Sequence, residues 1–199
     1  PARGDAVPPA RLPGRALVNA TRAAAADLRD APAAARADAP ARLAAAWRAV
    51  AAIPDPEIPV VSIVELGILR ELAVDGDRAT AILTPTYSGC PATAMIATSV
   101  RDALEALGFD ATVEFRLAPA WTTDWIAPEA QEKLRRYGIA PPGRAAAEQL
   151  RPLAFVPRVD CPLCGSGNTE RLSAFGATAC KALYRCRDCR EPFEFFKPL

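Results

Sequence analysis

The sequence contains no histidine in 199 residues. Histidine is the common general base beside a catalytic serine or cysteine, and it is a ligand in many zinc sites and in the Glu-x-x-His sites of di-iron carboxylate proteins. Its absence excludes Ser–His and Cys–His catalysis within this chain, histidine-containing zinc sites and di-iron sites of that type. Enzymes that depend on these groups are therefore excluded.

The chain also lacks a long hydrophobic run and a large charge of one sign. No apolar segment approaches the length of a membrane span, and the N-terminal residues do not include the hydrophobic segment of a secretory signal. The formal net charge is +1, so the composition does not favour nucleic acid or an anionic membrane as the main partner. We therefore predict a cytoplasmic protein that binds neither nucleic acid nor membrane.

Composition divides the chain into four parts. Residues 1–40 are rich in alanine, arginine and proline and have few large apolar side chains, which is typical of a disordered extension. Residues 41–143 contain the periodic patterns of a small folded domain. Residues 144–157 form a predicted linker, and residues 158–199 form a small cysteine-rich module.

The segment 41–143 predicts helices packed on a small sheet. An apolar stripe at helical spacing begins near Ala41, and Asp75-Gly76 joins two strands in a hairpin. A strand–helix–strand unit follows, whose right-handed crossover makes its two strands parallel, so that the three-stranded sheet is mixed. We predict an α+β or α/β domain with strands at Ile68–Val74, Arg78–Thr84 and Asp110–Leu117 and helices at Ala92–Leu107 and Pro128–Tyr137.

Cys90 lies where the second predicted strand ends and a helix begins. Gly89 suits a tight turn and Pro91 a first helical position. Sites in open α/β sheets lie at the carboxyl ends of strands, and exposed amides at a helix start stabilise a thiolate. Cys90 could therefore be a nucleophile, a redox thiol or a metal ligand. Alternatively, it is a small buried apolar residue.

Two further segments carry polar groups that could reach the same place. Asp55 and Glu57 lie in a proline-rich turn, where they supply carboxylates or merely cap a short helix predicted at Val61–Glu65. The segment Trp121-Thr-Thr-Asp-Trp125 follows the last strand of the domain. Two tryptophans so close together favour a packing role over a ligand stack.

The C-terminal module contains two Cys-x-x-Cys pairs, Cys161 with Cys164 and Cys186 with Cys189. The gap between the pairs is long enough for a hairpin, so four thiolates can surround one metal ion. Because no ligand position remains open, the spacing favours a structural zinc ion over redox dithiols, although residue type alone leaves iron or an iron–sulfur centre open. Cys180 lies outside both pairs, and it is either a buried strand residue or a neighbour of Cys90.

Several motifs resemble known families. Residues 55–59 and 64–68 with the Cys90 segment resemble the small domain shared by SufT and other iron–sulfur assembly proteins. The C-terminal cysteine motifs, together with residues 121–125, resemble the PaaD subunits of phenylacetyl-CoA epoxidase systems. The resemblance covers about residues 42–199, with Glu65 where the family commonly has aspartate.

This resemblance implies an accessory or maturation factor in aerobic phenylacetate degradation, and not an enzyme acting alone. It would help to deliver iron or an iron–sulfur cluster to an oxygenase or reductase subunit, with iron–sulfur assembly proteins as further partners. The alternatives are a non-catalytic structural subunit and a thiol enzyme that uses Cys90. The implied cargo-binding residues are Cys90, Asp55, Glu57, Glu65, Thr86 and Asp124, and the implied zinc ligands are Cys161, Cys164, Cys186 and Cys189.

Overall fold

The computed structural model describes residues 33–87, 89–142 and 159–198. Side-chain placement is described from residue 38 onwards. Most of the predicted extension at residues 1–40 and the whole predicted linker at residues 144–157 lie outside the described residues. No helix in the described ranges is both long enough and apolar enough to cross a membrane.

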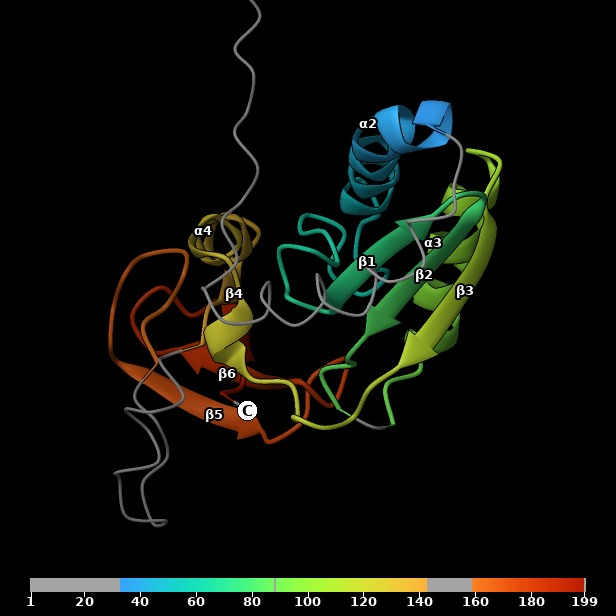
Figure 1. Ribbon diagram of the computed structural model, residues 1–199. Coiled ribbons are helices and arrows are strands. Elements are labelled where there is room, and N and C mark those ends of the chain that lie inside the picture. The colour runs from blue at the N-terminus through green and yellow to red at the C-terminus, as the bar shows by residue number, and fades with distance from the viewer. Residues whose placement is uncertain (1–32, 88, 143–158, 199) are drawn as a thin grey trace, which may run out of the picture.

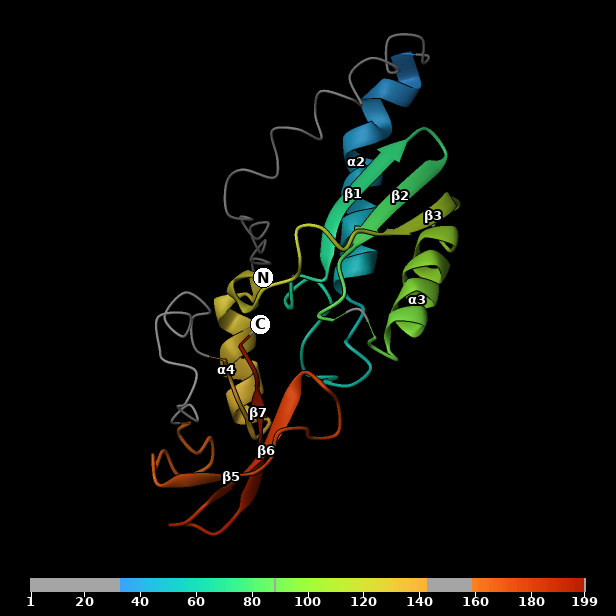
Figure 2. The same ribbon diagram turned by 90° about the horizontal axis from the view of Figure 1, so that it is seen from below.

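The first sheet is mixed, as the sequence predicts (Figure 1). Its three strands lie in the order β1 (Leu69–Asp75), β2 (Arg78–Leu83) and β3 (Asp110–Phe115). The β1–β2 hairpin is antiparallel, whereas β2 and β3 are parallel and are connected by α3 (Thr93–Glu105). Helix α2 (Ala33–Ala51) packs beside α3, and both contact the sheet, which gives the α+β architecture (Figure 2).

Helix α2 begins at Ala33, eight residues before the predicted start of order at Ala41. Six of these eight residues are alanine or arginine, which are strong helix formers, so the helical run continues upstream of the apolar stripe. Pro40 lies inside the helix. Pro40 cannot donate the helical hydrogen bond and its ring crowds the carbonyl group four residues earlier, yet the helix continues on both sides of it.

Two predicted helix boundaries differ from the structure. Residues 61–65 do not form a helix. The Leu66 and Gly67 N–H groups close hydrogen-bonded turns onto the Ser62 and Val64 carbonyl oxygens, and the run ends at Gly67, whose φ is +69°. A Cβ atom at Gly67 would lie 2.7 Å from the Trp125 Cβ atom, so both the backbone angle and the close packing require glycine. Helix α3 starts at Thr93, one residue after the predicted Ala92, and Cys90 lies in the turn before it.

The second sheet joins the cysteine-rich module to the preceding segment. Its strand order is β4-β7-β6-β5, in which β5 (Thr169–Ser173), β6 (Lys181–Cys186) and β7 (Pro192–Phe196) are antiparallel neighbours. The edge strand β4 (Ile139–Ala140) pairs in parallel with β7 and directly follows α4 (Pro128–Arg136). The module thus forms backbone hydrogen bonds with the chain that leads out of the first domain.

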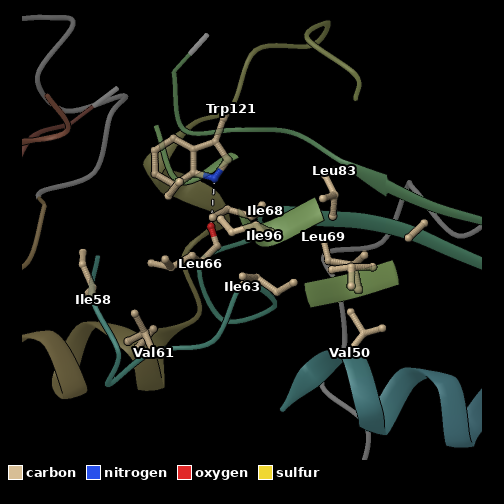
Figure 3. Close-up of a cluster of buried hydrophobic side chains, with 14 of the residues drawn as sticks. Val50, Ile58, Val61, Ile63, Leu66, Ile68, Leu69, Leu83, Ile96 and Trp121 are labelled. Atoms are coloured by element: carbon tan, nitrogen blue, oxygen red, sulfur yellow. Dashed lines mark hydrogen bonds between the residues drawn. The ribbon is translucent and has the colours of Figure 1, made fainter. Parts of the chain in front are cut away.

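Aromatic packing also connects the two parts. Trp121 is buried, and its indole N–H donates a 3.0 Å hydrogen bond to the Leu66 carbonyl oxygen (Figure 3). Its ring lies 5.9 Å from that of Phe196 on β7. Trp125, in the short 3-10 helix η2 (Thr123–Trp125), stacks under the Arg70 guanidinium at 3.5 Å. Both tryptophans therefore have the packing role that the sequence favours.

Candidate functional site

The four cysteines of the two Cys-x-x-Cys pairs converge in the C-terminal module. Their sulfur atoms all lie within 4.8 Å of one another. The Cys161 and Cys189 sulfurs are 3.8 Å apart, and those of Cys164 and Cys186 are 3.6 Å apart. In a tetrahedral zinc site with Zn–S bonds of about 2.3 Å, neighbouring sulfurs are about 3.8 Å apart. The cluster therefore has the dimensions of a four-thiolate zinc site.

Each cysteine pair lies in a tight turn that ends in the left-handed backbone region. The Gly165 N–H donates to the Cys161 carbonyl oxygen, and the Cys186 N–H donates to the Glu191 carbonyl oxygen. Gly165 and Arg190, which follow the second cysteine of each pair, have φ values of 75° and 69°. Because Thr169 at the start of β5 pairs with Cys186 at the end of β6, the two turns lie at the same end of the hairpin and present their sulfurs to a common centre.

The four thiols cannot all ionise without a cation between them. The backbone N–H groups of Cys189 and Asp188 lower the pKa of Cys186 to about 7. At Cys189 a hydrogen bond from the Glu191 amide lowers the pKa, but burial and the other three cysteines raise it to about 12. One thiolate therefore forms readily, and its negative charge disfavours ionisation of the neighbouring thiols. A bound metal cation would remove this repulsion.

Cys90 lies in a different environment, at a small pocket at the end of the first sheet. The pocket has a cavity volume of about 20 Å³, room for about one water molecule. Cys90 is half-buried there, and its carbonyl oxygen accepts a hydrogen bond from the Thr93 N–H at the start of α3. The pocket is lined by Asp55, Ile68, Leu83, Pro85, Thr86, Cys90, Thr93, Ile96 and Phe115.

Asp55 reaches the Cys90 pocket as a buried carboxylate. It is 6% exposed, and its Oδ1 atom accepts 2.9 Å hydrogen bonds from the backbone N–H groups of Glu57 and Ile58. Burial raises its pKa, the two amides and Lys181 oppose that rise, and the nearby Glu57 charge adds to it. Asp55 therefore caps its own turn at residues 55–58 and not the helix predicted at Val61–Glu65, which does not form, and it also lines the pocket beside Cys90.

Cys180 is buried, but it lies in the turn before β6 and not in a strand, and it belongs to the core cluster against which Cys90 packs. The loop between β5 and β6 brings it to the end of the first sheet, and Figures 1 and 2 show this orange-to-red loop against the loops of the first domain. Cys180 belongs to the hydrophobic core of that domain, and Cys90 packs against the same core. The sequence offers the Phe-Gly-x-Thr-x-Cys-Lys motif as a signal, but no local pattern specifies this contact.

Tyr87 connects the two cysteines. Its hydroxyl oxygen accepts a hydrogen bond from the Ala179 amide, beside Cys180. Burial raises the pKa of Tyr87, and the nearby Cys90 and Cys180 raise it further. The sequence analysis does not identify Tyr87, although it lies three residues before Cys90.

The remaining predicted residues divide into two groups. Thr86 lines the pocket, and the exposed Glu57 acts electrostatically on Asp55. Glu65 instead forms a capping box with Ser62, in which each side chain accepts a hydrogen bond from the other residue's backbone N–H. Its other oxygen lies 2.6 Å from the Lys133 ammonium on α4, and it is not among the pocket-lining residues.

Asp124 is likewise outside the pocket lining. It lies in η2, where its side chain is exposed and its N–H donates a 3.4 Å hydrogen bond to the Thr122 hydroxyl. The pocket therefore brings together Cys90, Asp55 and Thr86, with Glu57 acting on Asp55 from outside the lining.

Comparison with known proteins identifies both parts of the chain. Residues 43–115 match a family model described as iron-sulfur cluster assembly protein, and residues 147–197 match one described as PaaD zinc beta ribbon domain. The class is therefore an iron–sulfur assembly domain followed by a zinc β-ribbon. The chain is 48% identical over 160 residues to an Escherichia coli K12 protein named as a "putative 1,2-phenylacetyl-CoA epoxidase" subunit, covering 80% of this chain and 94% of that protein. The chain belongs to this family, the PaaD family.

Two solved structures are also similar to this chain. A domain of unknown function DUF59 from Bacillus anthracis has 24% identity and a TM-score of 0.46, and the match covers 50% of this chain and 96% of that one. A conserved hypothetical protein from Thermotoga maritima has 26% identity and a TM-score of 0.40, with 46% and 91% covered.

Proposed function

We propose that this protein is a non-catalytic accessory factor of a phenylacetyl-CoA epoxidase system. It helps to deliver iron or an iron–sulfur cluster to an oxygenase or reductase subunit, with Cys90 as the transfer ligand and Asp55 and Glu57 as supporting acids. The observation that carries the proposal is the contrast between a closed four-cysteine cluster and a small pocket that holds a half-buried thiol and a buried acid. Incomplete coordination suits a ligand set that must release its cargo.

The size of the Cys90 pocket argues against catalysis on a thioester. Ligand pockets for molecules of drug size have volumes of about 300 to 1,000 Å³, whereas this cavity has about 20 Å³. The pocket can therefore hold an ion or a water molecule, but it cannot enclose an acyl-CoA. Asp55, its buried acid, already accepts two backbone hydrogen bonds on one oxygen.

The four-cysteine cluster would hold a structural zinc ion through Cys161, Cys164, Cys186 and Cys189. The spacing of the sulfurs fits zinc, and four protein ligands leave no position for water or substrate. Bound zinc would supply stability and not chemistry. We therefore assign residues 158–199 as the ribbon module, residues 41–143 as the assembly domain and residues 144–157 as the linker of a cytoplasmic protein.

The ribbon also supports a docking role. Three large apolar side chains on it, Leu163, Leu172 and Phe175, are at least half exposed. Exposed apolar side chains of this size can mark a contact with a partner protein. The partners proposed are the epoxidase or reductase subunits and iron–sulfur assembly proteins. The same feature favours the second candidate, a permanent structural subunit, which predicts co-purification with the other subunits in a fixed ratio.

The proposed delivery role can be tested with the client subunits. The oxygenase and reductase subunits are produced together with the wild-type protein or with Cys90→Ser, and their iron and acid-labile sulfide contents are measured. We expect one client to lose most of its cofactor with the variant, while the zinc content of the variant stays at that of the wild type. Unchanged cofactor content in every client would contradict a role for Cys90 in delivery.

A further inference from the structure

Two exposed apolar side chains lie at the end of the ribbon hairpin that is farther from the four-cysteine cluster. Phe175 is 63% exposed in the loop between β5 and β6, and Leu172 is 50% exposed near the end of β5. The cluster lies at the other end of the hairpin, where Thr169 pairs with Cys186. The zinc site therefore does not explain why these apolar side chains face solvent.

Leu172 lies in an irregular part of an edge strand. In the sheet order β4-β7-β6-β5, β5 is at the edge. Arg171 pairs with Tyr184 and Ser173 pairs with Leu183, so the pairing of these two strands skips Leu172. Irregularities of this kind at sheet edges re-aim a side chain and disfavour the addition of another strand. This edge is therefore better suited to a side-chain contact than to strand pairing with a partner.

The Phe175 ring is held in place without a partner. The Lys197 ammonium lies 4.4 Å from the ring centroid, and it donates a 3.2 Å hydrogen bond to the Ala174 carbonyl oxygen. The Phe175 N–H donates a 3.2 Å hydrogen bond to the Ser173 hydroxyl. An exposed aromatic side chain that is already ordered loses little conformational entropy on binding, which makes it an effective anchor at a protein interface.

Glu194 on β7 fixes the rest of this loop. One carboxylate oxygen of Glu194 accepts a 3.0 Å hydrogen bond from the Ala177 N–H, and the other lies 2.6 Å from the Lys181 ammonium. The Gly176 N–H donates to the Lys181 carbonyl oxygen, and a Cβ atom at Gly176 would lie 2.7 Å from Glu194. The backbone on both sides of Phe175 is therefore held by specific contacts.

The cations at this end of the ribbon lack acidic partners. In the described part of the ribbon, three cationic side chains form ion pairs with glutamates, namely Lys181, Arg185 and Arg187. Arg171 and Lys197 form no such pair there. Apart from the paired Glu194, the acidic residues of the described ribbon lie near the cysteine turns, at Asp160, Glu170, Asp188 and Glu191. Positive charge therefore remains unbalanced beside Leu172 and Phe175.

Arg171 and Lys197 act on each other electrostatically. Burial lowers the pKa of Lys197, the nearby Cys180 opposes this change, and the Arg171 charge adds to it. An acidic group on a partner would remove the repulsion between the two cations, whereas a basic group would increase it. The charge at this end of the ribbon therefore complements an acidic surface.

We propose that Arg171, Leu172, Phe175 and Lys197, together the Phe175 surface, bind an acidic surface of a client protein, with Phe175 inserted into an apolar pocket of that client. This inference rests on the proposed delivery function and deepens it, because it names the docking site and the chemistry of the partner. Leu163, which is also exposed, lies in the first cysteine turn and does not belong to the Phe175 surface.

The position of the Phe175 surface suits a docking site for delivery. Five residues after Phe175, the same loop reaches Cys180, which belongs to the hydrophobic core of the assembly domain. Five residues of chain span at most about 18 Å. A client bound to Phe175 therefore lies beside the domain that contains the Cys90 pocket.

The small number of unpaired cations favours a protein as the partner. Proteins that bind duplex DNA commonly contact about 6 to 10 phosphates, and electrostatic attachment to an anionic membrane uses clusters of about four to eight Lys or Arg residues. Arg171 and Lys197 fall short of both numbers. Two cations around an aromatic anchor are instead typical of the mixed apolar and charged character of a protein interface.

The test measures binding of the full-length, zinc-loaded protein to each purified oxygenase and reductase subunit by calorimetry, at low and at high salt. The variants are Phe175→Ala, Leu172→Ala and Arg171→Glu, with zinc content and circular dichroism as checks of folding. Duplex DNA and phosphatidylglycerol vesicles serve as the other probes.

Two matched controls change similar side chains outside the Phe175 surface. Tyr137→Ala removes an aromatic side chain that is 54% exposed at the end of α4, beside the opposite edge strand β4. Arg101→Glu makes the same change in net charge as Arg171→Glu, on an exposed position of α3.

We expect Phe175→Ala to weaken the binding of at least one subunit at least about tenfold, and Leu172→Ala to weaken it less. Arg171→Glu should weaken the same complex at least about threefold at low salt and by a smaller factor at high salt. Tyr137→Ala and Arg101→Glu should stay within about twofold of the wild type.

The outcomes separate the docking site from the delivery function. Equal binding of a subunit by the wild type, Phe175→Ala and Arg171→Glu would overturn the Phe175 surface and leave delivery standing. Binding of the wild type to DNA or vesicles but to no subunit would also overturn it. If Phe175→Ala weakens docking while Cys90→Ser leaves the cofactor content of every client unchanged, the Phe175 surface stands and delivery through Cys90 fails.

Discussion

The four-cysteine cluster and the Cys90 pocket differ in how completely the chain surrounds a bound atom. In the ribbon, four sulfurs from two turns of one small module lie within 4.8 Å of one another. At the end of the first sheet, the cavity beside Cys90 has about 20 Å³. Under the proposed function, cysteine retains one metal in the ribbon and passes on another at the Cys90 pocket.

The largest expected effect comes from removing one cysteine of the four-cysteine cluster in the ribbon. Cys186→Ser removes a ligand that is fully buried, and metal binding worth on the order of 10 kcal/mol supports a module of this size. We expect loss of zinc and loss of the ribbon fold, measured by metal analysis and near-ultraviolet circular dichroism. Cys90→Ser is the control and should keep one zinc per chain. A zinc-free Cys186→Ser protein with a native spectrum would contradict the structural role of the metal.

The next effect concerns the charge pair that holds the Cys180 loop. Lys181→Met leaves Glu194 without its partner in a largely buried place, which should lower the free energy of unfolding by about 3 kcal/mol. Chemical denaturation measures this change. A loss of less than about 1 kcal/mol would contradict the role of this ion pair in holding the loop.

A smaller effect is expected at Glu65, which belongs to the motif but not to the pocket lining. Glu65→Ala removes the capping box with Ser62 and the pair with Lys133, at a cost of about 1 to 2 kcal/mol in unfolding free energy. Iron affinity should stay within about twofold of the wild type, because Glu65 does not line the Cys90 pocket. A large loss of iron binding at unchanged stability would place Glu65 in that site.

The Glu65 contribution should also depend on pH. Burial raises the pKa of Glu65, but the hydrogen bonds from Lys133 and Ser62 lower it by more, so it lies below the ordinary value of 4.5. A carboxylate with a lowered folded-state pKa stabilises the fold fully above that ordinary value and loses the contribution as the pH falls through the folded-state pKa. The stability difference between wild type and Glu65→Ala should therefore shrink below about pH 4, as measured by denaturation across that range.

The smallest effect is expected at Arg190, the residue after the second cysteine pair. Its φ of 69° is unfavourable for a residue with a side chain, whereas Gly165 occupies the equivalent place in the first pair without this cost. Arg190→Gly should raise the stability of the zinc-bound ribbon by up to about 1 kcal/mol. A clear destabilisation in thermal unfolding would mean that the Arg190 side chain makes a contribution greater than its backbone cost.

Local patterns were sufficient to predict much of the fold. Alternation and the Asp75-Gly76 turn predicted the hairpin and the mixed sheet, and Cys-x-x-Cys spacing predicted the ribbon cluster. These features depend on residues near one another in sequence or on a small module with few alternatives. Helix ends were less accurate, because alanine-rich sequence extends α2 upstream and a single capped turn at Ser62 replaces a predicted helix.

Which residues line the Cys90 pocket depends on contacts that no local sequence pattern specifies. The charge and spacing of Asp55, Glu65 and Asp124 do not distinguish an acid that lines the pocket from one that caps a turn or lies in a neighbouring loop. Only packing of the ribbon against the first domain places Cys180 in the core cluster against which Cys90 packs. The pairing of β4 with β7, which helps to fix that packing, likewise joins segments more than 50 residues apart.

We propose that the four-cysteine cluster retains its zinc ion, whereas the Cys90 site releases iron. The most direct test loads the zinc-bound protein anaerobically with Fe²⁺, adds a chelator as acceptor, and follows both metals over time by elemental analysis after rapid desalting. The account predicts that iron passes to the chelator while zinc stays at one per chain. Iron and zinc that leave together, or iron that is retained as firmly as zinc, would contradict it.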